Sequence, residues 1–298
     1  MKKVSVGSWA YIMGEYGDKP MMLPELCAGL NDLGYDGISM GGFKPHANPE
    51  LFDTDEKRAG LKKLLSDNSM EVADYAVDTW SVDSLKQTDE WLAFYTAGVE
   101  FMAKMGWDII RIDSGTPPVL PDGMTYADAM DKIKAIFKKC AAIAAKEGIN
   151  VVWEFEPGFM INEPKNVVQT VKDVGEKNFS LLLDTCHAHM GAVIGSRHIE
   201  EGCKLSGGIV EYVTMAKDII GHVHVIDSDG TLNETDTSTH NPFGTGDIDF
   251  DVVIPAILDI GNYKGDWWSV DLCEWPQAWQ VTADSKAFVD KINDKYCK

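Results

Sequence analysis

The sequence predicts an α/β fold in which eight parallel strands close into a (β/α)8 TIM barrel, a single domain over residues 1–298. Eight short β-branched or apolar runs recur along the chain, and longer segments with helical spacing lie between them. The runs start about 30 to 45 residues apart, which is room for one strand, one helix and two loops. No Pro/Gly/Ser-rich linker divides the chain. The alternative is an open doubly wound sheet, whose common G-x-G-x-x-G marker is missing after the first run.

The predicted strands account for the barrel in order. They are Val4–Trp9, Gly37–Met40, Glu71–Val77, Ile109–Asp113, Asn150–Glu156, Ser180–Asp184, His222–Ile226 and Trp267–Leu272. Strands that alternate with helices pair in parallel, and eight of them are the number that closes a barrel of this type.

Helices are predicted between the first six strands, over Leu23–Leu33, Asp55–Asp67, Thr88–Met105, Tyr126–Glu147 and Pro164–Val174. The clearest is 126–147, where apolar residues recur at three- and four-residue steps and Gly148 follows as a stop. Gly34 and Gly106 each follow a helical segment and precede a strand, the place where a left-handed C-cap residue is needed.

Composition excludes several classes of protein. The chain has 27 basic and 47 acidic side chains, a net charge of −20, so its field repels phosphate backbones and anionic lipids. We therefore expect no nucleic-acid and no membrane partner. Apolar residues make up 45% and charged residues 25%, as in folded globular domains. The six cysteines are scattered without a C-x-x-C pair, and no signal-peptide core is present, so a cytoplasmic location is expected.

Polar residues follow the last four predicted strands, where a barrel of this type places its reactive groups. These strands end in Trp153-Glu154-Phe155-Glu156, Leu183-Asp184-Thr185-Cys186-His187, His222-Val223-His224-Val225-Ile226-Asp227 and Ser269-Val270-Asp271-Leu272-Cys273-Glu274. An unpaired charge emerging from an apolar run is heavily penalised by desolvation. A divalent cation is the simplest compensation, because carboxylate oxygens and an imidazole suit Mn²⁺, Mg²⁺, Co²⁺ or Zn²⁺.

The same segments carry a family resemblance. W-E-F at 153–155, D-x-x-H at 184–187, H-x-x-D at 224–227, G-x-G-x-x-D at 244–249 and W-S-V-D at 268–271 resemble the sugar isomerase/epimerase superfamily with xylose-isomerase-like TIM barrels. That group includes ketose 3-epimerases, hydroxypyruvate isomerases and inosose isomerases or dehydratases. The motifs occur in the family's order, whereas the first half of the chain resembles the family only in architecture.

The resemblance implies a metal held by Glu154, Asp184, His224 and a carboxylate on the last strand, with Mn²⁺ the favoured ion. In this sequence the last position is Asp271, where the family most often has glutamate. Because aspartate is one methylene shorter, Glu274 is the alternative ligand. Strand alternation places the two on opposite faces, which favours Asp271.

The function predicted from this pattern is that of a divalent-metal-dependent isomerase or epimerase of an unphosphorylated sugar or polyol. Removing a proton α to a carbonyl creates an enediolate, which a metal stabilises as a Lewis acid. We expect Glu154 and Asp271 to act as base and acid. His187 matches a family histidine beside metal and substrate. A phosphorylated substrate is disfavoured by the net charge and by the lack of a basic side chain near 227–230, where some relatives carry an arginine.

Further candidates surround this set. His46 and Lys44 follow the second strand at the reactive end of the barrel and are predicted to contact substrate. Glu156 shares the face of Glu154, so either carboxylate could ligate; the resemblance selects Glu154 and leaves Glu156 to bind a hydroxyl. His240 precedes the Gly-x-Gly loop and is a second candidate for the pocket lining. That loop itself is expected only to turn the chain.

Other residues have a structural prediction. His222 lies one layer deeper than His224 and is expected to be structural. Arg111 and Asp113, at the end of the fourth strand, are expected to pair with each other. Trp9, Trp80 and Trp153 could stack on sugar rings, but core packing is favoured for most tryptophans in the chain.

Two other functions remain open. A lyase or dehydratase of the same superfamily would use the same base and metal on a keto-sugar or 3-keto-glycoside and expel a β-substituent. A non-catalytic sugar- or metal-binding barrel, as a homo-oligomer or a partner subunit of a larger complex, belongs to another class. The apurinic endonuclease branch shares the barrel but requires extra His/Glu ligands and a basic face, which the sequence lacks.

Overall fold

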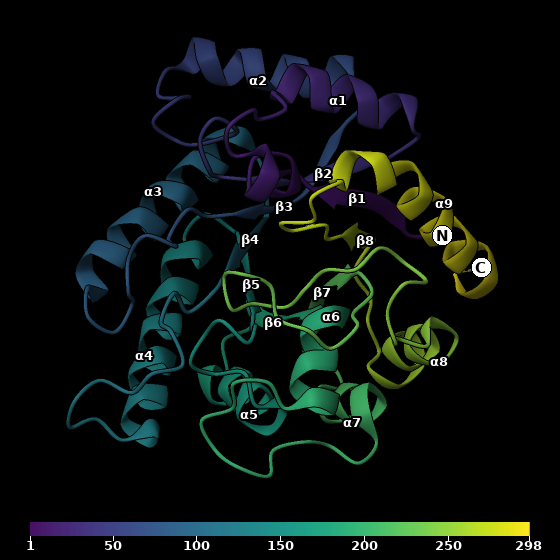
Figure 1. Cartoon of the computed structure of the whole chain (residues 1–298). Helices are drawn as coiled ribbons and strands as arrows, with labels where there is room; N and C mark the ends of the chain where they lie inside the picture. Colours follow the sequence, from purple (N-terminus) through teal and green to yellow (C-terminus); the bar gives the residue numbers. More distant parts are fainter. Residues whose placement is uncertain (298) are drawn as a thin grey trace.

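A computed structural model describes residues 1–297, and its centre is a closed barrel of parallel strands (Figure 1). The strands pair in chain order and β1 pairs with β8, which closes the sheet. They are β1 (Lys3–Gly7), β2 (Gly37–Gly41), β3 (Glu71–Ala76), β4 (Ile109–Ile112), β5 (Asn150–Glu154), β6 (Phe179–Asp184), β7 (Ile220–Val225) and β8 (Trp267–Val270). The predicted (β/α)8 barrel is confirmed, and the open sheet is excluded.

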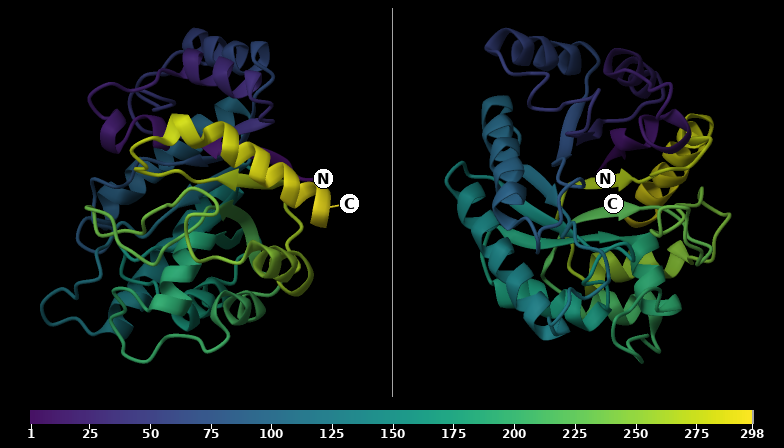
Figure 2. Two further views of the ribbon diagram at one scale, coloured as in Figure 1. Left: turned by 45° about the vertical axis from the view of Figure 1, so that its right-hand side comes forward. Right: turned by 60° about the vertical axis from the view of Figure 1, so that its left-hand side comes forward.

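Helices lie around the outside of the strands in Figures 1 and 2. They are α1 (Leu23–Asp32), α2 (Asp55–Asp67), α3 (Thr88–Met105), α4 (Tyr126–Ala145), α5 (Pro164–Val174), α6 (Thr185–His189), α7 (Gly208–Met215), α8 (Phe250–Pro255) and α9 (Ala278–Tyr296). Of the five predicted helices, α2, α3 and α5 have the expected bounds. The other two, α1 and α4, begin where predicted and end one and two residues earlier than predicted. Gly106 caps α3 with φ 78°, as predicted. None of the helices in the described range is long and apolar enough to cross a membrane.

Several strands are shorter at their carboxyl ends than the sequence predicts. The runs expected to reach Trp9, Glu156 and Leu272 stop pairing at Gly7, Glu154 and Val270. A 3₁₀ turn, Ser8–Tyr11, replaces the end of the first run. Trp9, Phe155 and Leu272 remain buried although they lie beyond the last paired residue of their strands. Because the apolar runs continue past the last paired residue, the sequence predicts these strands to be longer than they are.

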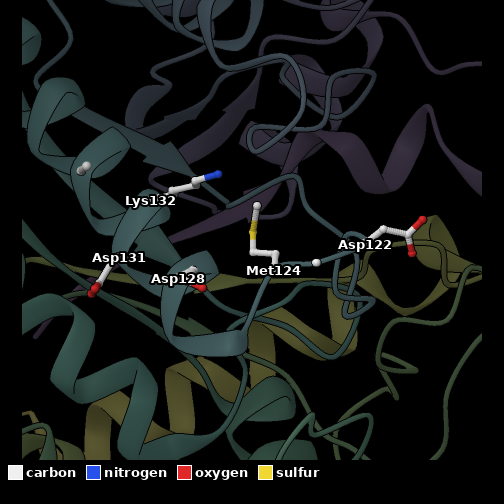
Figure 3. Close-up of a pocket in the computed structure, with 7 residues that line it drawn as sticks. Asp122, Met124, Asp128, Asp131 and Lys132 are labelled. Carbon is white, nitrogen blue, oxygen red and sulfur yellow. The ribbon is translucent and has the colours of Figure 1, made fainter.

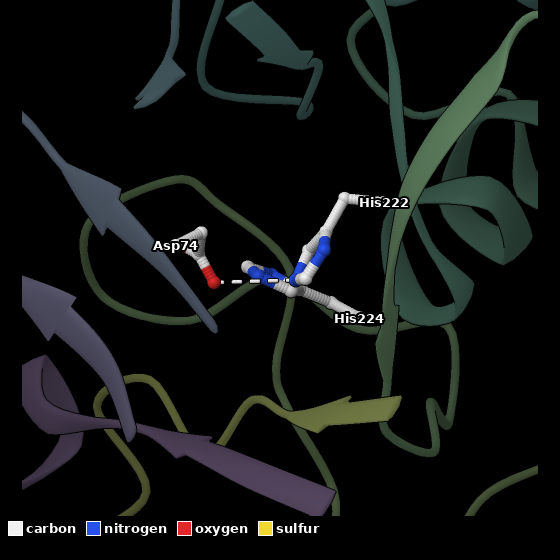
Figure 4. Close-up of side chains that lie close together, drawn as sticks. All are labelled: Asp74, His222 and His224. Atoms are coloured by element: carbon white, nitrogen blue, oxygen red, sulfur yellow. Dashed lines mark ion pairs between the residues drawn. The ribbon is translucent and has the colours of Figure 1, made fainter. Parts of the chain in front are cut away.

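The interior of the barrel contains a layer of polar side chains, here called the lower layer: Ser5, Ser39, Asp74, His222 and Ser269. Each is at most 1% exposed. His222 Nε2 lies 2.9 Å from Ser269 Oγ and 3.2 Å from Asp74 Oδ2, a pair drawn in Figure 4. Ser39 donates to Asp74, and Ser5 and Ser269 are joined by a hydroxyl contact of 2.7 Å. The structural role predicted for His222 agrees with this geometry.

The chain ends meet on the outside of the barrel. The Lys2 amide donates to Asn293 Oδ1 at 3.1 Å, and Asn293 Nδ2 donates back to the Lys2 carbonyl at 2.8 Å. This pair ties α9 to the start of β1, and Figures 1 and 2 show the two termini close together. These two hydrogen bonds join the segment before β1 to the helix that follows β8, next to the place where the barrel closes.

Candidate metal centre

Three carboxylates and one imidazole meet at the carboxyl rim of the barrel. His224 Nδ1 lies 2.9 Å from Glu154 Oε1, 3.5 Å from Asp271 Oδ2 and 4.0 Å from Asp184 Oδ2. The four come from the ends of β5, β6 and β7 and from the residue after β8. One donor atom of each lies within 4.8 Å of all the others, and all four side chains are buried. We call these residues the rim cluster.

Donor atoms of the rim cluster are buried without ordinary hydrogen bonds. Among residues 1–297, neither oxygen of Glu154, neither ring nitrogen of His224, nor Asp184 Oδ2 has a partner with hydrogen-bond geometry. Ligands at 2.0–2.2 Å from one ion lie about 3 to 3.5 Å from one another, close to the measured spacings. Oxygen donors with one imidazole suit a divalent ion. The residues present therefore fit the metal that the sequence implies.

The electrostatics of the rim cluster indicate the same need for a cation. Burial, and then the charges of Glu154 and Asp271, raise the pKa of Asp184 well above its ordinary value. Burial also opposes ionisation of Glu154, but the Arg111 guanidinium and His224 more than offset it and lower the pKa of that carboxyl. A divalent ion would favour the ionised form of every carboxylate here.

Asp271, and not Glu274, is the carboxylate that the fold brings to the rim cluster. The Trp9 indole donates to Asp271 Oδ1 at 2.9 Å and the Cys273 amide donates to the same oxygen at 2.8 Å, which leaves Oδ2 facing His224. Glu274 has φ 57° and accepts hydrogen bonds from Asn233 and Thr235 at 2.7 and 2.8 Å. The shorter side chain is thus positioned by two donors, one of them from the β1–α1 segment.

Asp184 has two tasks that explain its place at the start of α6. Its Oδ1 accepts the amide of His187 at 2.9 Å and caps the helix, while Oδ2 faces the rim cluster. The helix in turn places His187 over the site, with Nδ1 2.8 Å from Ser238 Oγ and Nε2 3.7 Å from Glu156 Oε2. Burial lowers the pKa of His187 to about 3, so the ring is neutral.

Glu156 and His240 lie beside the rim cluster. Glu156 accepts a hydrogen bond from Thr237, and burial raises its pKa to about 8. His240 Nε2 is 4.0 Å from Asp271 Oδ2, and the His240 ring meets the edge of the His187 ring at a centroid distance of 5.0 Å. Neither nitrogen of His240 has a hydrogen-bond partner within the described chain. Both residues are therefore placed where a substrate hydroxyl could reach them.

Lys44 and His46 are not brought to the rim cluster. Lys44 pairs with Glu50 and is exposed, in a separate 380 Å³ pocket. His46 is buried, and its Nε2 lies 2.8 Å from the carbonyl of Met21 in the segment before α1. The loop after β2 thus turns the His46 ring toward the segment before α1, which sequence position alone does not reveal.

Arg111 does not form the predicted pair with Asp113. It forms an ion pair with Glu154, and its guanidinium lies 4.9 Å from the centroid of the Trp9 ring. Asp113 instead accepts the indole N–H of Trp80. The available sequence signal was a charged residue inside the apolar run 109–112, because such a side chain near a strand end must find a partner inside the barrel.

Asp227 explains two of the sequence motifs together. Its carboxylate accepts the amides of Gly244, Gly246 and Ile248 at 2.9 to 3.1 Å. A Cβ at position 246 would lie 2.5 Å from this carboxylate, so the second glycine is needed for the close approach. The H-x-x-D aspartate thus anchors the Gly-x-Gly loop, which turns the chain as expected.

A cavity of about 630 Å³ reaches this rim from outside. Its lining includes His240, Cys273 and Glu274 together with Glu15 and Asp18. A second cavity, drawn in Figure 3, lies at the start of α4 and is lined by residues such as Asp122, Met124 and Asp128, none of which belongs to the rim cluster. The first cavity is therefore the one that adjoins the candidate centre.

Comparisons with known proteins agree with the fold. A family model described as xylose isomerase-like TIM barrel matches residues 27–289. An IolI protein with a bound zinc atom has 18% identity and a TM-score of 0.74 over 100% of both chains. A D-tagatose 3-epimerase-like protein has 18% identity and a TM-score of 0.71 over 99% of both chains. The 3-keto-D-glucoside 4-epimerase of E. coli has 16% identity and a TM-score of 0.69 over 98% of this chain and 100% of its own. A comparison with curated proteins gives no match.

Proposed function

Since this chain belongs to the xylose isomerase-like TIM barrel family, we propose that it is a divalent-metal-dependent epimerase or isomerase of an unphosphorylated sugar or polyol. The observation that carries the proposal is the rim cluster, in which three buried carboxylates face one imidazole nitrogen. The similar structures include a 3-keto-D-glucoside 4-epimerase and a D-tagatose 3-epimerase-like protein, which act on or are named for carbonyl sugars.

Glu154, Asp184, His224 and Asp271 would hold the ion, with Mn²⁺ proposed first and Mg²⁺, Co²⁺ or Zn²⁺ as alternatives; one similar structure contains zinc. When bound, the ion supplies Lewis-acid polarisation of a substrate carbonyl. The donor set also leaves coordination positions for substrate oxygens, since divalent ions of this group accept more than four ligands.

The acid and base proposed for proton transfer are Glu154 and Asp271. They reach the same nitrogen of His224 from strands on either side of β7, so they can face a substrate carbon from two directions. One carboxylate removes the proton α to the carbonyl, and the other returns a proton to the opposite face or to the neighbouring carbon. Return of the proton to the opposite face of the same carbon gives an epimer. Return to the neighbouring carbon gives an isomer.

The surroundings favour a neutral substrate. Glu15, Asp18, Glu234 and Glu274 line the adjoining cavity, and no lysine or arginine is among its lining residues in the described chain. A phosphate group would meet like charge there. His187, Glu156 and His240 offer uncharged donors and acceptors for hydroxyl groups, which is the chemistry a polyol presents.

Solvent exchange tests the proposal. Purified protein is stripped with a chelator, reloaded with Mn²⁺, Co²⁺, Mg²⁺ or Zn²⁺, and incubated in D₂O with ketoses and keto-glycosides. We expect metal-dependent deuterium incorporation α to the carbonyl, seen by NMR, with epimer or isomer formed. Release of an aglycone or water without epimer would assign a lyase instead. Full activity in thoroughly demetallated protein, or no exchange with any carbonyl sugar, would overturn the proposal.

A further inference from the structure

Arg111 is the only lysine or arginine among the buried residues of the described chain. It lies at the end of β4, across the barrel from β8, and is 5% exposed. Burying a fixed positive charge is costly unless partners repay it. A guanidinium cannot lose its proton in a protein, so this charge is permanently present beside the rim cluster.

Contacts fix the guanidinium over the reactive carboxylates. One amino group pairs with Glu154, and the plane lies 4.9 Å from the centroid of the Trp9 ring. Trp9 itself donates to Asp271. Arg111 therefore contacts the proposed acid/base Glu154 directly and Asp271 through one intervening ring. Burial lowers the pKa of Arg111, but Glu154, Asp271 and further carboxylates outweigh it and raise that pKa.

The guanidinium has more donors than Glu154 can use. A guanidinium has five N–H donors, all in its plane, and Arg111 Nε is buried without a hydrogen-bond partner in residues 1–297. A buried unpaired donor costs free energy, which an acceptor arriving with the ligand would recover. The 227–230 turn after the end of β7 contains no lysine or arginine. The one buried lysine or arginine beside the rim cluster in the described chain therefore comes from β4, and it retains a free donor.

We propose that Arg111 is a catalytic residue that donates a hydrogen bond to the carbonyl oxygen of the bound sugar and stabilises the negative charge that forms there. This inference rests on the proposed function, since it assumes a substrate with a proton α to a carbonyl.

The chemical step balances without a redox partner. The C–H bond α to the carbonyl breaks, and its proton goes to Glu154 or Asp271. The electron pair forms a carbon–carbon double bond, while the carbonyl π pair moves to the oxygen that Arg111 contacts. Return of a proton to carbon reverses the flow and leaves Arg111 unchanged. Fixed donors aimed at such an oxygen stabilise the transition state more than the ground state.

Variants at position 111 test the inference. Arg111→Met removes the charge at similar volume, Arg111→Lys keeps the charge without the fork, and Arg111→Ala leaves space for added guanidinium. Arg58→Met is the matched control, because Arg58 also pairs with a carboxylate, Asp55, but on α2. Each protein is measured for bound Mn²⁺, thermal unfolding, and kcat and KM of α-proton exchange with a ketose that the wild type turns over.

The expected result is a kcat lower by about 10²- to 10³-fold in Arg111→Met, with bound Mn²⁺ unchanged. Arg111→Lys should recover part of the rate, Arg111→Ala should regain rate with added guanidinium, and Arg58→Met should match the wild type. An Arg111→Met enzyme with kcat within threefold of wild type would refute the inference. Loss of Mn²⁺ in step with activity, restored together by guanidinium, would also refute it and assign Arg111 to positioning Glu154. A wild type without exchange would instead overturn the proposed function.

Discussion

Two polar layers lie one above the other inside this barrel, and they differ in how many carboxylates surround the histidine: Asp74 alone beside His222, but three around His224. In the lower layer, Asp74 accepts from Ser39 and pairs with His222, whose Nε2 also contacts Ser269. In the rim cluster, Glu154 and Asp184 retain carboxylate oxygens without hydrogen-bond partners among the described residues. Both layers are buried and both contain a carboxylate beside a histidine of β7.

The difference teaches what a functional polar cluster looks like. Buried polar groups are ordinarily paired, and in the lower layer the single carboxylate has both a hydroxyl donor and an imidazole within reach of its Oδ2. In the rim cluster, three buried carboxylates share one imidazole and one guanidinium, and their mutual repulsion is relieved by an added cation or carried as a cost to the fold. Figure 4 shows how near the two are: Asp74 reaches toward His222 and His224, which are neighbours on one strand.

The largest difference is expected in catalysis. Glu154→Gln keeps the shape of the side chain but removes its charge and its basicity, so α-proton exchange should fall at least about 10³-fold. Asp74→Asn, the matched change in the lower layer, should leave exchange within about tenfold of wild type. NMR of deuterium incorporation checks both. Equal losses in the two variants would mean that the layers do not differ in function.

The next largest difference is expected in how strongly a bound metal stabilises variants of the two layers. An ion that binds only the folded state stabilises it by about 2.7 kcal/mol when its free concentration is 100 times Kd. Wild type and Asp74→Asn should both gain this on adding Mn²⁺, whereas Asp184→Asn should gain little, because a ligand is lost. Thermal unfolding with and without Mn²⁺ gives the answer. If none of the divalent ions changed the melting temperature of the wild type, the assignment of the rim cluster as a metal site would be contradicted.

Without metal, the two aspartates should differ in their effect on stability. Asp74→Asn replaces one carboxylate oxygen that Ser39 and His222 contact, and should destabilise the protein by about 1 to 3 kcal/mol. Asp184→Asn should be neutral or stabilising in the same buffer, since it removes repulsion with Glu154 and Asp271. Urea unfolding in the presence of a chelator measures both. The comparison fails if Asp184→Asn proves the more damaging of the two.

In the metal-free protein, a pH dependence of opposite sign is expected for the two layers. Burial raises the pKa of Glu156 from 4.5 to about 8. Between these values the unfolded chain has lost a proton that the folded chain keeps, so stability falls as pH rises, by at most about 1.4 kcal/mol per pH unit. Glu156→Gln should abolish that fall.

Asp74 supplies the opposite sign. Burial opposes its ionisation, but His222 and Ser39 outweigh it and lower its pKa below 3.8. Its contribution is present above pH 3.8 and is lost as the pH falls further, because the unfolded chain then binds the extra proton. Asp74→Asn should therefore lose its disadvantage at low pH. Urea unfolding from pH 3 to 8 tests both variants, and parallel wild-type and variant profiles would contradict the two assignments.

Much of the rim cluster was predictable because strand ends are local features of sequence. Glu154, Asp184, His224 and Asp271 each follow or end an apolar run, and parallel strands bring such ends to one rim. The same reasoning predicted that Lys44 and His46 reach the site because they follow β2 at that rim, but the structure does not bring them to the rim cluster. Lys44 pairs with Glu50 of the same loop, and His46 contacts the Met21 carbonyl; no periodicity identifies these partners.

Arg111 shows the limit more sharply. Proximity in sequence suggested Asp113 as its partner, yet the barrel places Glu154 of the adjacent strand within its reach. The interior alternation of β4 directs this side chain toward the barrel axis, where the carboxylates of several strands outweigh one neighbour in sequence. Charge pairing inside a closed sheet is a property of three dimensions.

The sequence by itself determined the repeating strand–helix order, the single rim at which its polar residues gather, and the donor types that suit a divalent ion, because these follow from periodicity and side-chain chemistry. Only the tertiary structure decided which groups remain unpaired. Barrel closure sets His222 against Asp74 and Ser269, and it brings donor atoms of Glu154, Asp184 and Asp271 within 4.8 Å of one another around His224. Hydrogen-bond satisfaction depends on distances of a few tenths of an ångström between distant segments, and only the packed fold fixes those.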